Sequence, residues 1–391
     1  MRVLLNATAA ELAQLGGDFT HYRDYRRLAG DGVSYEFVPP DRVRRACAIL
    51  RKAFEKSCRT WQPAAMQRRL FLASRYLYVP PKAAGNADLI FSHLLFPAGT
   101  GDRIPIVWSS QGISPAAYYE RYNPDQWTVE DVAWIYRQLG RRADALIIFT
   151  ETCARNVVAW CPELEGKIHC IPAPVFAEGG DPAGKPSRRD GLIRLLFVGV
   201  DSQRKGLPEV IEAYSAVRER AGHIRLDIVS RPSQALQRRI GLLRDAQLHW
   251  SSPGVDVKAL MKQADIFVLP THADTYALAT VEAMAHGCAT IISDLDPLPE
   301  VAGNGETGFA VPVGDSRALA DSLQRMISNL DLLRSFQENA KRRFRKLHAP
   351  EVVASRLNQL FAQILRRRKA PDFRTDPIGA IREANNQDIP T

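Results

Sequence analysis

One strand, loop, helix and strand pattern in the second half of the chain constrains the fold more than any other feature. The apolar run IFVLP at 266–270 is followed by a short polar loop, by strong helix formers at 277–285, and by a second apolar run at 289–293. Gly287, between the helix and the second run, is a residue that commonly ends helices. Short apolar runs bounded in this way are typical of strands buried in a parallel sheet.

Two carboxylates accompany this unit. Asp274 lies in the loop just before the helix, and Glu282 lies eight positions further on, within the helix. Open α/β sheets bind ligands at the carboxyl ends of their strands, and the free N–H groups at the start of a helix attract anions. The pair therefore predicts a ligand that carries both hydroxyl groups and phosphates.

The same alternation of strand and helix runs through the whole chain in two series. A segment rich in Gly, Pro and charge at 177–190 separates the series and has the composition of a linker. We interpret as strands the apolar runs 2–6, 35–38, 89–92, 104–108, 145–149 and 168–171, and then 193–198, 224–229, 266–269, 289–293 and 309–311. At 391 residues the chain is longer than a single hydrophobic core usually supports. We predict an α/β protein with two Rossmann-like doubly wound domains that face each other across a cleft.

The two series also set the expected domain boundaries. We place an amino-terminal domain at 1–180, a linker at 181–190 and a carboxyl-terminal domain at 191–350. The pattern is helical from 315 to about 369, and we expect the helix from about 351 to pack back on the amino-terminal domain. Residues 371–391 are polar and contain proline, so we expect a mobile tail there.

Composition narrows the class of protein. The sequence contains no run of about 18 uncharged apolar residues and no signal-peptide core, which indicates a cytoplasmic protein. Its six cysteines lack the spacing of a zinc site, so we interpret them as reduced thiols. The formal net charge of +9 favours an anionic partner, but charge alone does not choose among nucleic acid, an acidic membrane surface and phosphorylated ligands.

A second element suited to phosphate lies at 195–206, LLFVGVDSQRKG. Gly199 ends the apolar strand, and Arg204 and Lys205 follow in the polar loop. Glycine lets the backbone approach a ligand, and a lysine beside a helix start is a compact counter-charge for a diphosphate. A plain turn with solvated basic residues is the alternative. The literal GxGxxG at 303–308 precedes a strand instead of following one, so we interpret it as a turn.

These residues resemble the retaining glycosyltransferases of family 4, whose two Rossmann-like domains form the GT-B arrangement. The similarity is strongest at 195–315. There the family pattern of an acidic residue, seven residues and Glu-Ala-Met-Ala before a Gly runs from Asp274 to Gly287, and TGFAVPVGD follows at 307–315. The fainter matches in the amino-terminal domain are the Gly16-Gly17 loop, ADLIFSH ending at His93, IPIVWSSQG at 104–112 and ADALIIFTE ending at Glu151.

The resemblance implies a role for each matching position. Glu282 would hold the ribose hydroxyls of the nucleotide, Asp274 would contact hydroxyls of the donor sugar, and Lys205 would neutralise the leaving diphosphate. Backbone groups at Thr275, Tyr276 and Ala277 would bind sugar or phosphate, and Gly17 and Gly199 would let the backbone approach the diphosphate. The implied donor is a UDP- or GDP-sugar, with no metal or other cofactor.

Three departures from the family pattern bear on donor identity and activity. Asp274 stands where the family usually has Glu, which keeps the charge but shortens the reach by one methylene. Val200 replaces an arginine that contacts the diphosphate, a loss for which Arg204 could substitute. Gln111 stands where a histidine is common.

Several features carry two interpretations. His93 ends an apolar strand facing the cleft, so it could contact donor or acceptor, but a hydrogen-bonded structural histidine is the alternative. Trp108, Tyr118 and Tyr119 could stack on a sugar ring or pack in the core. The stretch 41–78 has ten Lys or Arg residues against two acidic ones, interleaved with aromatic residues. It suits contact with an anionic membrane surface at the inner face of the membrane, and a solvated basic helix pair fits it equally well.

The sequence therefore predicts a cytoplasmic glycosyltransferase that retains the anomeric configuration and moves a hexose-type sugar to a saccharide or lipid-linked acceptor. Two alternatives from other classes stay open. A catalytically silent scaffold of the same fold would account for Val200 and Gln111. A basic nucleic-acid-binding protein would account for the charge, but it would leave the acidic pair without a role and lacks a recognisable binding module.

Overall fold

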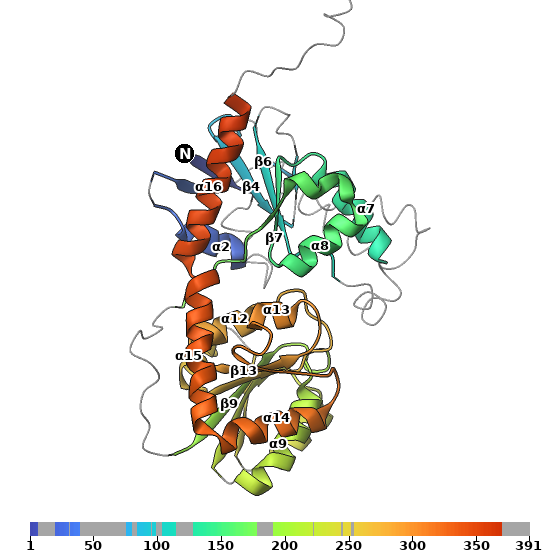
Figure 1. The fold of residues 1–391 in the computed structure, drawn as a ribbon, viewed down its shortest axis with the longest axis vertical. Coiled ribbons are helices and arrows are strands. Elements are labelled where there is room, and N and C mark those ends of the chain that lie inside the picture. The colour runs from blue at the N-terminus through green and yellow to red at the C-terminus, as the bar shows by residue number, and fades with distance from the viewer. Residues whose placement is uncertain are drawn as a thin grey trace, which may run out of the picture.

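The computed structural model describes residues 1–6, 20–30, 32–39, 76–79, 84–94, 96–98, 104–114, 128–177, 191–221, 223–243, 245–251 and 254–369. Within these residues the chain forms two six-stranded sheets, each surrounded by helices, the first above the second in Figure 1. Every strand pair in both sheets is parallel. The predicted α/β class with two doubly wound domains is confirmed.

The first sheet has the strand order β2-β1-β4-β6-β7-β8. Its strands are β1 (Arg2–Leu5), β2 (Ser34–Phe37), β4 (Leu89–His93), β6 (Ile106–Ser110), β7 (Ala145–Ile148) and β8 (Ile168–Cys170). The helices beside it are α2 (Thr20–Arg27), α7 (Val129–Gly140) and α8 (Glu151–Trp160), with a 3-10 helix, η2, at Pro162–Lys167. Two short strands, β3 (Tyr76–Tyr78) and β5 (Phe96–Ala98), pair apart from the sheet.

The second sheet has the order β11-β10-β9-β12-β13-β14. Its strands are β9 (Ile193–Gly199), β10 (Ile224–Ser230), β11 (Ala246–Trp250), β12 (Ile266–Leu269), β13 (Ala289–Ser293) and β14 (Gly308–Val311). The helices between them are α9 (Leu207–Ala221), α10 (Gln234–Gly241), α11 (Val257–Gln263), α12 (Leu278–Ala285) and α13 (Leu298–Ala302). The chain order reverses between β9 and β12, so the carboxyl ends of these two strands flank a topological switch point, where open sheets bind ligands.

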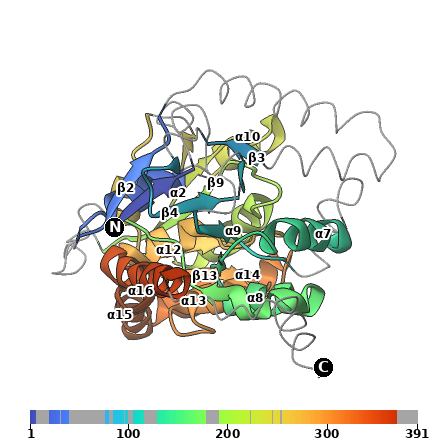
Figure 2. The same cartoon turned by 90° about the horizontal axis from the view of Figure 1, so that it is seen from above.

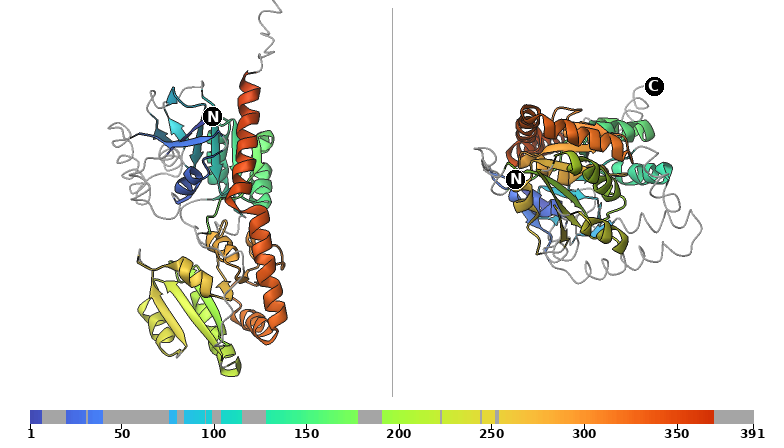
Figure 3. Two further views of the ribbon diagram at one scale, coloured as in Figure 1. Left: turned by 90° about the vertical axis from the view of Figure 1, so that its left-hand side faces the viewer. Right: turned by 90° about the horizontal axis from the view of Figure 1, so that it is seen from below.

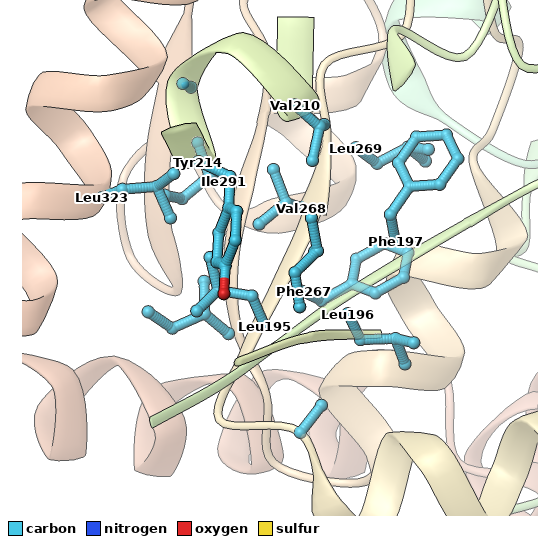
Figure 4. Packing of buried hydrophobic residues seen from close by; sticks show 14 of the residues in the cluster. Leu195, Leu196, Phe197, Val210, Tyr214, Phe267, Val268, Leu269, Ile291 and Leu323 are labelled. Carbon is cyan, nitrogen blue, oxygen red and sulfur yellow. The ribbon is translucent and has the colours of Figure 1, made fainter. Parts of the chain in front are cut away.

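The core of the second domain shows why its central strands are continuously apolar. All four residues of β12 are buried, because helices cover both faces of the sheet. Figure 4 shows Phe267 and Val268 of β12 in one buried cluster with Phe197 of β9 and Val210 of α9. Tyr214 lies in the same cluster and donates from its hydroxyl to the carbonyl of Ile224 at 3.2 Å, so the buried phenol is satisfied.

Three helices follow at the end of the described residues: α14 (Ser316–Ser328), α15 (Leu330–Leu347) and α16 (Pro350–Lys369). The helices α15 and α16 run along one side of both domains (Figures 1 and 3), and from above α16 and α8 lie on the same side of β2 and β4 (Figure 2). Phe361 of α16 packs against Phe91 of β4 with ring centroids 6.2 Å apart. At the far end of the helix Arg368 pairs with Asp144 at 2.8 Å. The last helix therefore belongs spatially to the first domain.

The eleven apolar runs interpreted as strands all appear as strands, with ends shifted by a residue or two. The strands β3, β5 and β11 were not predicted from the sequence. Of these, β11 is an edge strand in which none of the five residues is buried, so it lacks the apolar pattern of its neighbours. The glycines at 303–308 form the turn between α13 and β14, as expected. The expected linker at 181–190 and the tail at 371–391 lie outside the described residues. Among the described helices none is long and apolar enough to cross a bilayer.

Candidate active site

Asp274 is held by the backbone of its own loop at the carboxyl end of β12. Its Oδ1 accepts hydrogen bonds from the amides of Thr275 at 2.8 Å, Tyr276 at 3.2 Å and Ala277 at 2.9 Å. These amides precede the first residue of α12, because Ala277 adopts a left-handed conformation with φ of 51° and the helix begins at Leu278, one residue later than expected. The carboxylate therefore occupies the anion-attracting start of this helix.

The other oxygen of Asp274 forms an ion pair with the ammonium of Lys205. The Asp274 side chain is only 12% exposed and that of Lys205 18%. Burial by itself would raise the pKa of Asp274, but the adjacent Lys205 charge and the backbone N–H groups together hold that pKa below its usual value. The site thus contains an ionised carboxylate and a cation in contact, drawn from two different strand-to-helix crossovers.

The loop that carries Lys205 packs directly on the Asp274 loop. The Arg204 guanidinium donates to the carbonyl of Ala273 at 2.7 Å, and its Nε pairs with Asp201 at 3.1 Å. His272 N donates to the carbonyl of Arg204 at 2.7 Å. Arg204 thus ties the two loops together, and the role expected for it on the diphosphate would require its side chain to leave Ala273.

Two glycines allow this close approach. Gly206 has φ of +80°, and a Cβ there would lie 2.1 Å from the carbonyl oxygen of Pro270. A Cβ on Gly199 would lie 2.7 Å from Cβ of Lys205. Gly199 therefore makes room for the lysine side chain against the end of β9, and Gly206 makes room for the two loops to meet.

Glu282 lies in the second turn of α12 and is half-buried. It therefore belongs to the helix whose start carries the Asp274 loop, on the connection between β12 and β13. The exposed side chain of Val200, 56% accessible, follows directly after β9, where the family pattern has an arginine. The described part of this edge thus presents one lysine and one arginine, at 205 and 204, from the loop after β9.

The amides of Thr275, Tyr276 and Ala277 were expected to bind sugar or phosphate. In the structure all three donate to Asp274, so a phosphate would have to displace this carboxylate in order to use them. The Tyr276 side chain turns away from that edge into the core, where burial raises the pKa of its hydroxyl far above the usual value. There its hydroxyl bonds to Nδ1 of His348 at 3.0 Å.

The amino-terminal domain meets this loop through contacts that the sequence does not reveal. Thr275 Oγ1 donates to Oε1 of Gln111, the residue that follows β6. The ring of Phe149, just after β7, lies 5.1 Å from that of Tyr276. The carboxylate of Glu300, in α13, accepts from the amides of Glu151 at 2.6 Å and Thr152 at 2.8 Å at the start of α8. No motif signals these pairs, because each joins residues far apart in sequence.

His93 does not face open solvent. It is 1% exposed, its Nδ1 lies 3.2 Å from Ser109 Oγ, and its ring stacks on Phe149 with centroids 5.5 Å apart. This is the geometry of the hydrogen-bonded structural histidine, the alternative to the site role. Trp108 is likewise core, 3% exposed and packed against Tyr136.

The remaining predictions concern residues outside the contacts described above. Gly17, Tyr118, Tyr119, Cys47, Cys58 and residues 41–75 of the basic stretch lie outside the described residues. Of the cysteines that the structure describes, Cys153, Cys161 and Cys288 are buried free thiols and Cys170 is a half-buried one. No group of His, Cys, Asp and Glu in the described ranges has the geometry of a metal site.

Comparison with known proteins finds similarity to glycosyltransferases in sequence and in fold. Residues 184–343 match the model of the family described as glycosyl transferases group 1. The chain is 32% identical over 174 residues to phosphatidyl-myo-inositol mannosyltransferase of Mycobacterium leprae, a match that covers 44% of this chain and 46% of the relative. The chain thus spans about half the length of the curated relatives it matches first.

Two solved structures share the fold over nearly the whole chain. Sucrose-phosphate synthase from Thermosynechococcus elongatus superposes with a TM-score of 0.67 at 17% identity, covering 94% of this chain and all of the other. HepE from Anabaena, in complex with UDP, superposes with a TM-score of 0.62 at 14% identity, covering 93% of this chain and 99% of the other. The two-domain GT-B arrangement is thereby confirmed.

Proposed function

We propose that this protein is a retaining glycosyltransferase that moves a sugar from a nucleotide diphosphate donor to a saccharide or lipid-linked acceptor, because its residues 184–343 match the model of the group 1 glycosyl transferases. One observation carries the proposal. Lys205 and Asp274, from separate crossovers of the carboxyl-terminal sheet, meet at the start of α12 beside the switch point of that sheet.

The charges of this site suit the bond that has to break. As a sugar leaves a diphosphate, positive charge develops on the sugar ring and negative charge on the diphosphate oxygens. The ammonium of Lys205 is the group that would stabilise the leaving diphosphate. Since this ammonium is already paired with Asp274, both groups are held in place before the donor binds, which reduces the reorganisation needed during reaction.

The two carboxylates take different roles in this proposal. Asp274, with a pKa below its usual value, is ionised at neutral pH and accepts hydrogen bonds from hydroxyls of the donor sugar. Glu282, in the second turn of α12, accepts hydrogen bonds from the ribose hydroxyls. The acceptor hydroxyl attacks the sugar from the face that the diphosphate leaves, so the anomeric configuration is retained and no protein nucleophile is required.

Donor and acceptor classes are supported by the relatives. HepE binds UDP in its solved complex, and the M. leprae relative is named for mannosyl transfer to phosphatidyl-myo-inositol. We propose a UDP- or GDP-sugar as the donor and an acceptor that carries free hydroxyls on a saccharide or a lipid-linked headgroup. For a lipid-linked acceptor the protein would work in the cytoplasm at the inner membrane face, with residues 41–78 as the contact surface.

A thermal-shift panel of UDP, GDP and their sugars tests the donor assignment, because a ligand that binds only the folded state raises the melting temperature. We expect a shift with one nucleotide series and its loss in Glu282→Ala, together with loss of turnover. Glu219→Ala, an exposed glutamate in α9, is the matched control and should keep the shift. An unchanged shift and unchanged turnover in Glu282→Ala would contradict the proposal, and a wild-type protein that binds no nucleotide would favour the silent scaffold.

A further inference from the structure

One side chain of the amino-terminal domain reaches across to the loop that carries Asp274. Gln111 is half-buried directly after β6, at the carboxyl edge of the first sheet. Its Oε1 accepts the hydrogen bond from Thr275 Oγ1. The contact therefore joins the two sheet edges that face each other in the GT-B arrangement.

The side chains of three consecutive residues in this loop contact different domains. The side chain of Asp274 binds Lys205 of its own domain. The side chain of Thr275 binds Gln111, and the ring of Tyr276 packs on Phe149. The amides of these same peptide units, at 275 and 276, bind Asp274 Oδ1. Whatever fixes Thr275 and Tyr276 therefore also fixes the carboxylate.

The backbone that carries Gln111 is itself held tightly. Gly112 has φ of +94°, and a Cβ on it would lie 2.5 Å from Cβ of Cys153 in α8. The start of α8 is in turn bound by Glu300 of the carboxyl-terminal domain, at 2.6 and 2.8 Å. Gln111 thus extends from a closely packed strand end, and its side-chain oxygen has a defined position relative to Thr275.

We propose that Gln111 is a positioning residue: by holding Thr275 across the domain boundary it orients the Asp274 carboxylate toward Lys205 and the donor sugar. An uncharged acceptor suits this place, because a second cation beside the carboxylate would compete with Lys205 for it. The effect on turnover rests on the proposed function, whereas the effect on the loop does not. Gln111, which stands where the family pattern commonly has a histidine, then serves the hydrogen bond with Thr275. Its presence does not indicate lost activity.

Two kinds of measurement test this role. Amide hydrogen exchange at 275–277 in the ligand-free protein reports how firmly the loop is held. Turnover of the nucleotide sugar identified by the thermal-shift panel, resolved into kcat and KM, reports the consequence for catalysis. The variants are Gln111→Ala, Thr275→Val, which removes the hydroxyl but keeps the shape, and their combination. Gln237→Ala is the matched control, since the Gln237 side chain donates to the carbonyl of Pro232 in its own domain, at 3.0 Å.

Loss of this partly buried hydrogen bond predicts exchange about five- to tenfold faster at the three amides and a kcat lower by about the same factor. The UDP or GDP shift should stay at the wild-type value, because the nucleotide contacts assigned to Lys205 and Glu282 do not involve Thr275. The double variant should be no worse than either single variant, since both remove the same bond. Thr275→Ser keeps the hydroxyl of the contact without adding a charge and should leave exchange slow.

Unchanged exchange at 275–277 in Gln111→Ala would overturn the inference, as would additive losses in the double variant. A lower nucleotide shift in proportion to the lower kcat would also overturn it, because it would indicate general damage to the donor domain. If the wild-type protein binds no nucleotide, the proposed function fails, and the exchange measurement still decides whether Gln111 holds the loop.

Discussion

The two facing sheet edges are built from different chemistry. The carboxyl-terminal edge presents a lysine and an aspartate in contact, fixed by backbone amides and close-packed glycines. The described part of the amino-terminal edge presents Gln111, the buried His93 and a helix start already bound by Glu300. Among the residues that the structure describes, the charge suited to a phosphorylated ligand is thus concentrated in the carboxyl-terminal domain. The other domain contributes position, and substitutions on the two edges should therefore differ in kind.

The largest expected effect is on the charged edge. Lys205→Ala should lower kcat by about 100- to 1,000-fold, the range seen when one preorganised charge-stabilising donor is removed. It also leaves Asp274 without its cation, so the free energy of unfolding should fall. Steady-state turnover and urea unfolding measure the two effects. Lys262→Ala, an exposed lysine in α11, should change neither, and a Lys205→Ala enzyme within threefold of wild type would place the catalytic charge elsewhere.

An effect of intermediate size is expected on the pH dependence of the unfolding free energy. It involves His348, whose Nδ1 bonds to the hydroxyl of Tyr276. Burial, together with the charges of Arg343 and Arg356, lowers the pKa of His348 from 6.5 to about 3. The folded protein then holds this imidazole neutral while the unfolded chain protonates it, so stability should fall as the pH drops from about 6.5 toward about 3. The slope contributed by this one group is about 1.4 kcal/mol per pH unit.

Asp274 acts in a separate window. Its lowered pKa means that its stabilising contribution is present above its ordinary value of 3.8 and is lost only as the pH falls through the lower folded value. Unfolding free energies measured from pH 7 to pH 4 therefore exclude Asp274. His169, whose pKa burial also lowers, contributes to the slope in this range, so the comparison with a variant isolates His348. His348→Gln should flatten that part of the profile, and a variant with the wild-type slope would assign the loss to other groups.

The smallest expected effect is where Glu300 of the carboxyl-terminal domain contacts the start of α8. Glu300→Ala removes the carboxylate from the start of α8 and should cost about 1 kcal/mol of unfolding free energy, as the loss of a helix cap does. Hydrogen exchange at the amides of Glu151 and Thr152 should rise. Thr150→Ala removes the cap that this helix receives from its own domain, at Cys153 N, so it should raise exchange at Cys153 and leave the Glu300 contact intact. If the amides of Glu151, Thr152 and Cys153 exchanged at the wild-type rate in both variants, the start of α8 would not depend on its contact with Glu300.

The contrast between the two sheet edges also explains which features could be predicted from the sequence and which could not. Every all-buried strand, such as β12, was predicted, because a continuous apolar run between polar loops has few other outcomes. The loops that carry Lys205 and Asp274 were placed at one sheet edge by the same logic. β11 was missed because its half-exposed residues show no apolar pattern. Glu300 and the hydrogen bond between Gln111 and Thr275 depend on how two domains meet, which no local pattern encodes.

The position of α16 has a consequence for exchanging parts between relatives. The helix follows the carboxyl-terminal domain in the gene, yet it packs on Phe91 and binds Asp144 of the amino-terminal one. A hybrid enzyme joined only at the interdomain linker would pair this helix with a foreign sheet. Recombination that exchanges one whole domain between relatives therefore needs two crossover points, the second near residue 350.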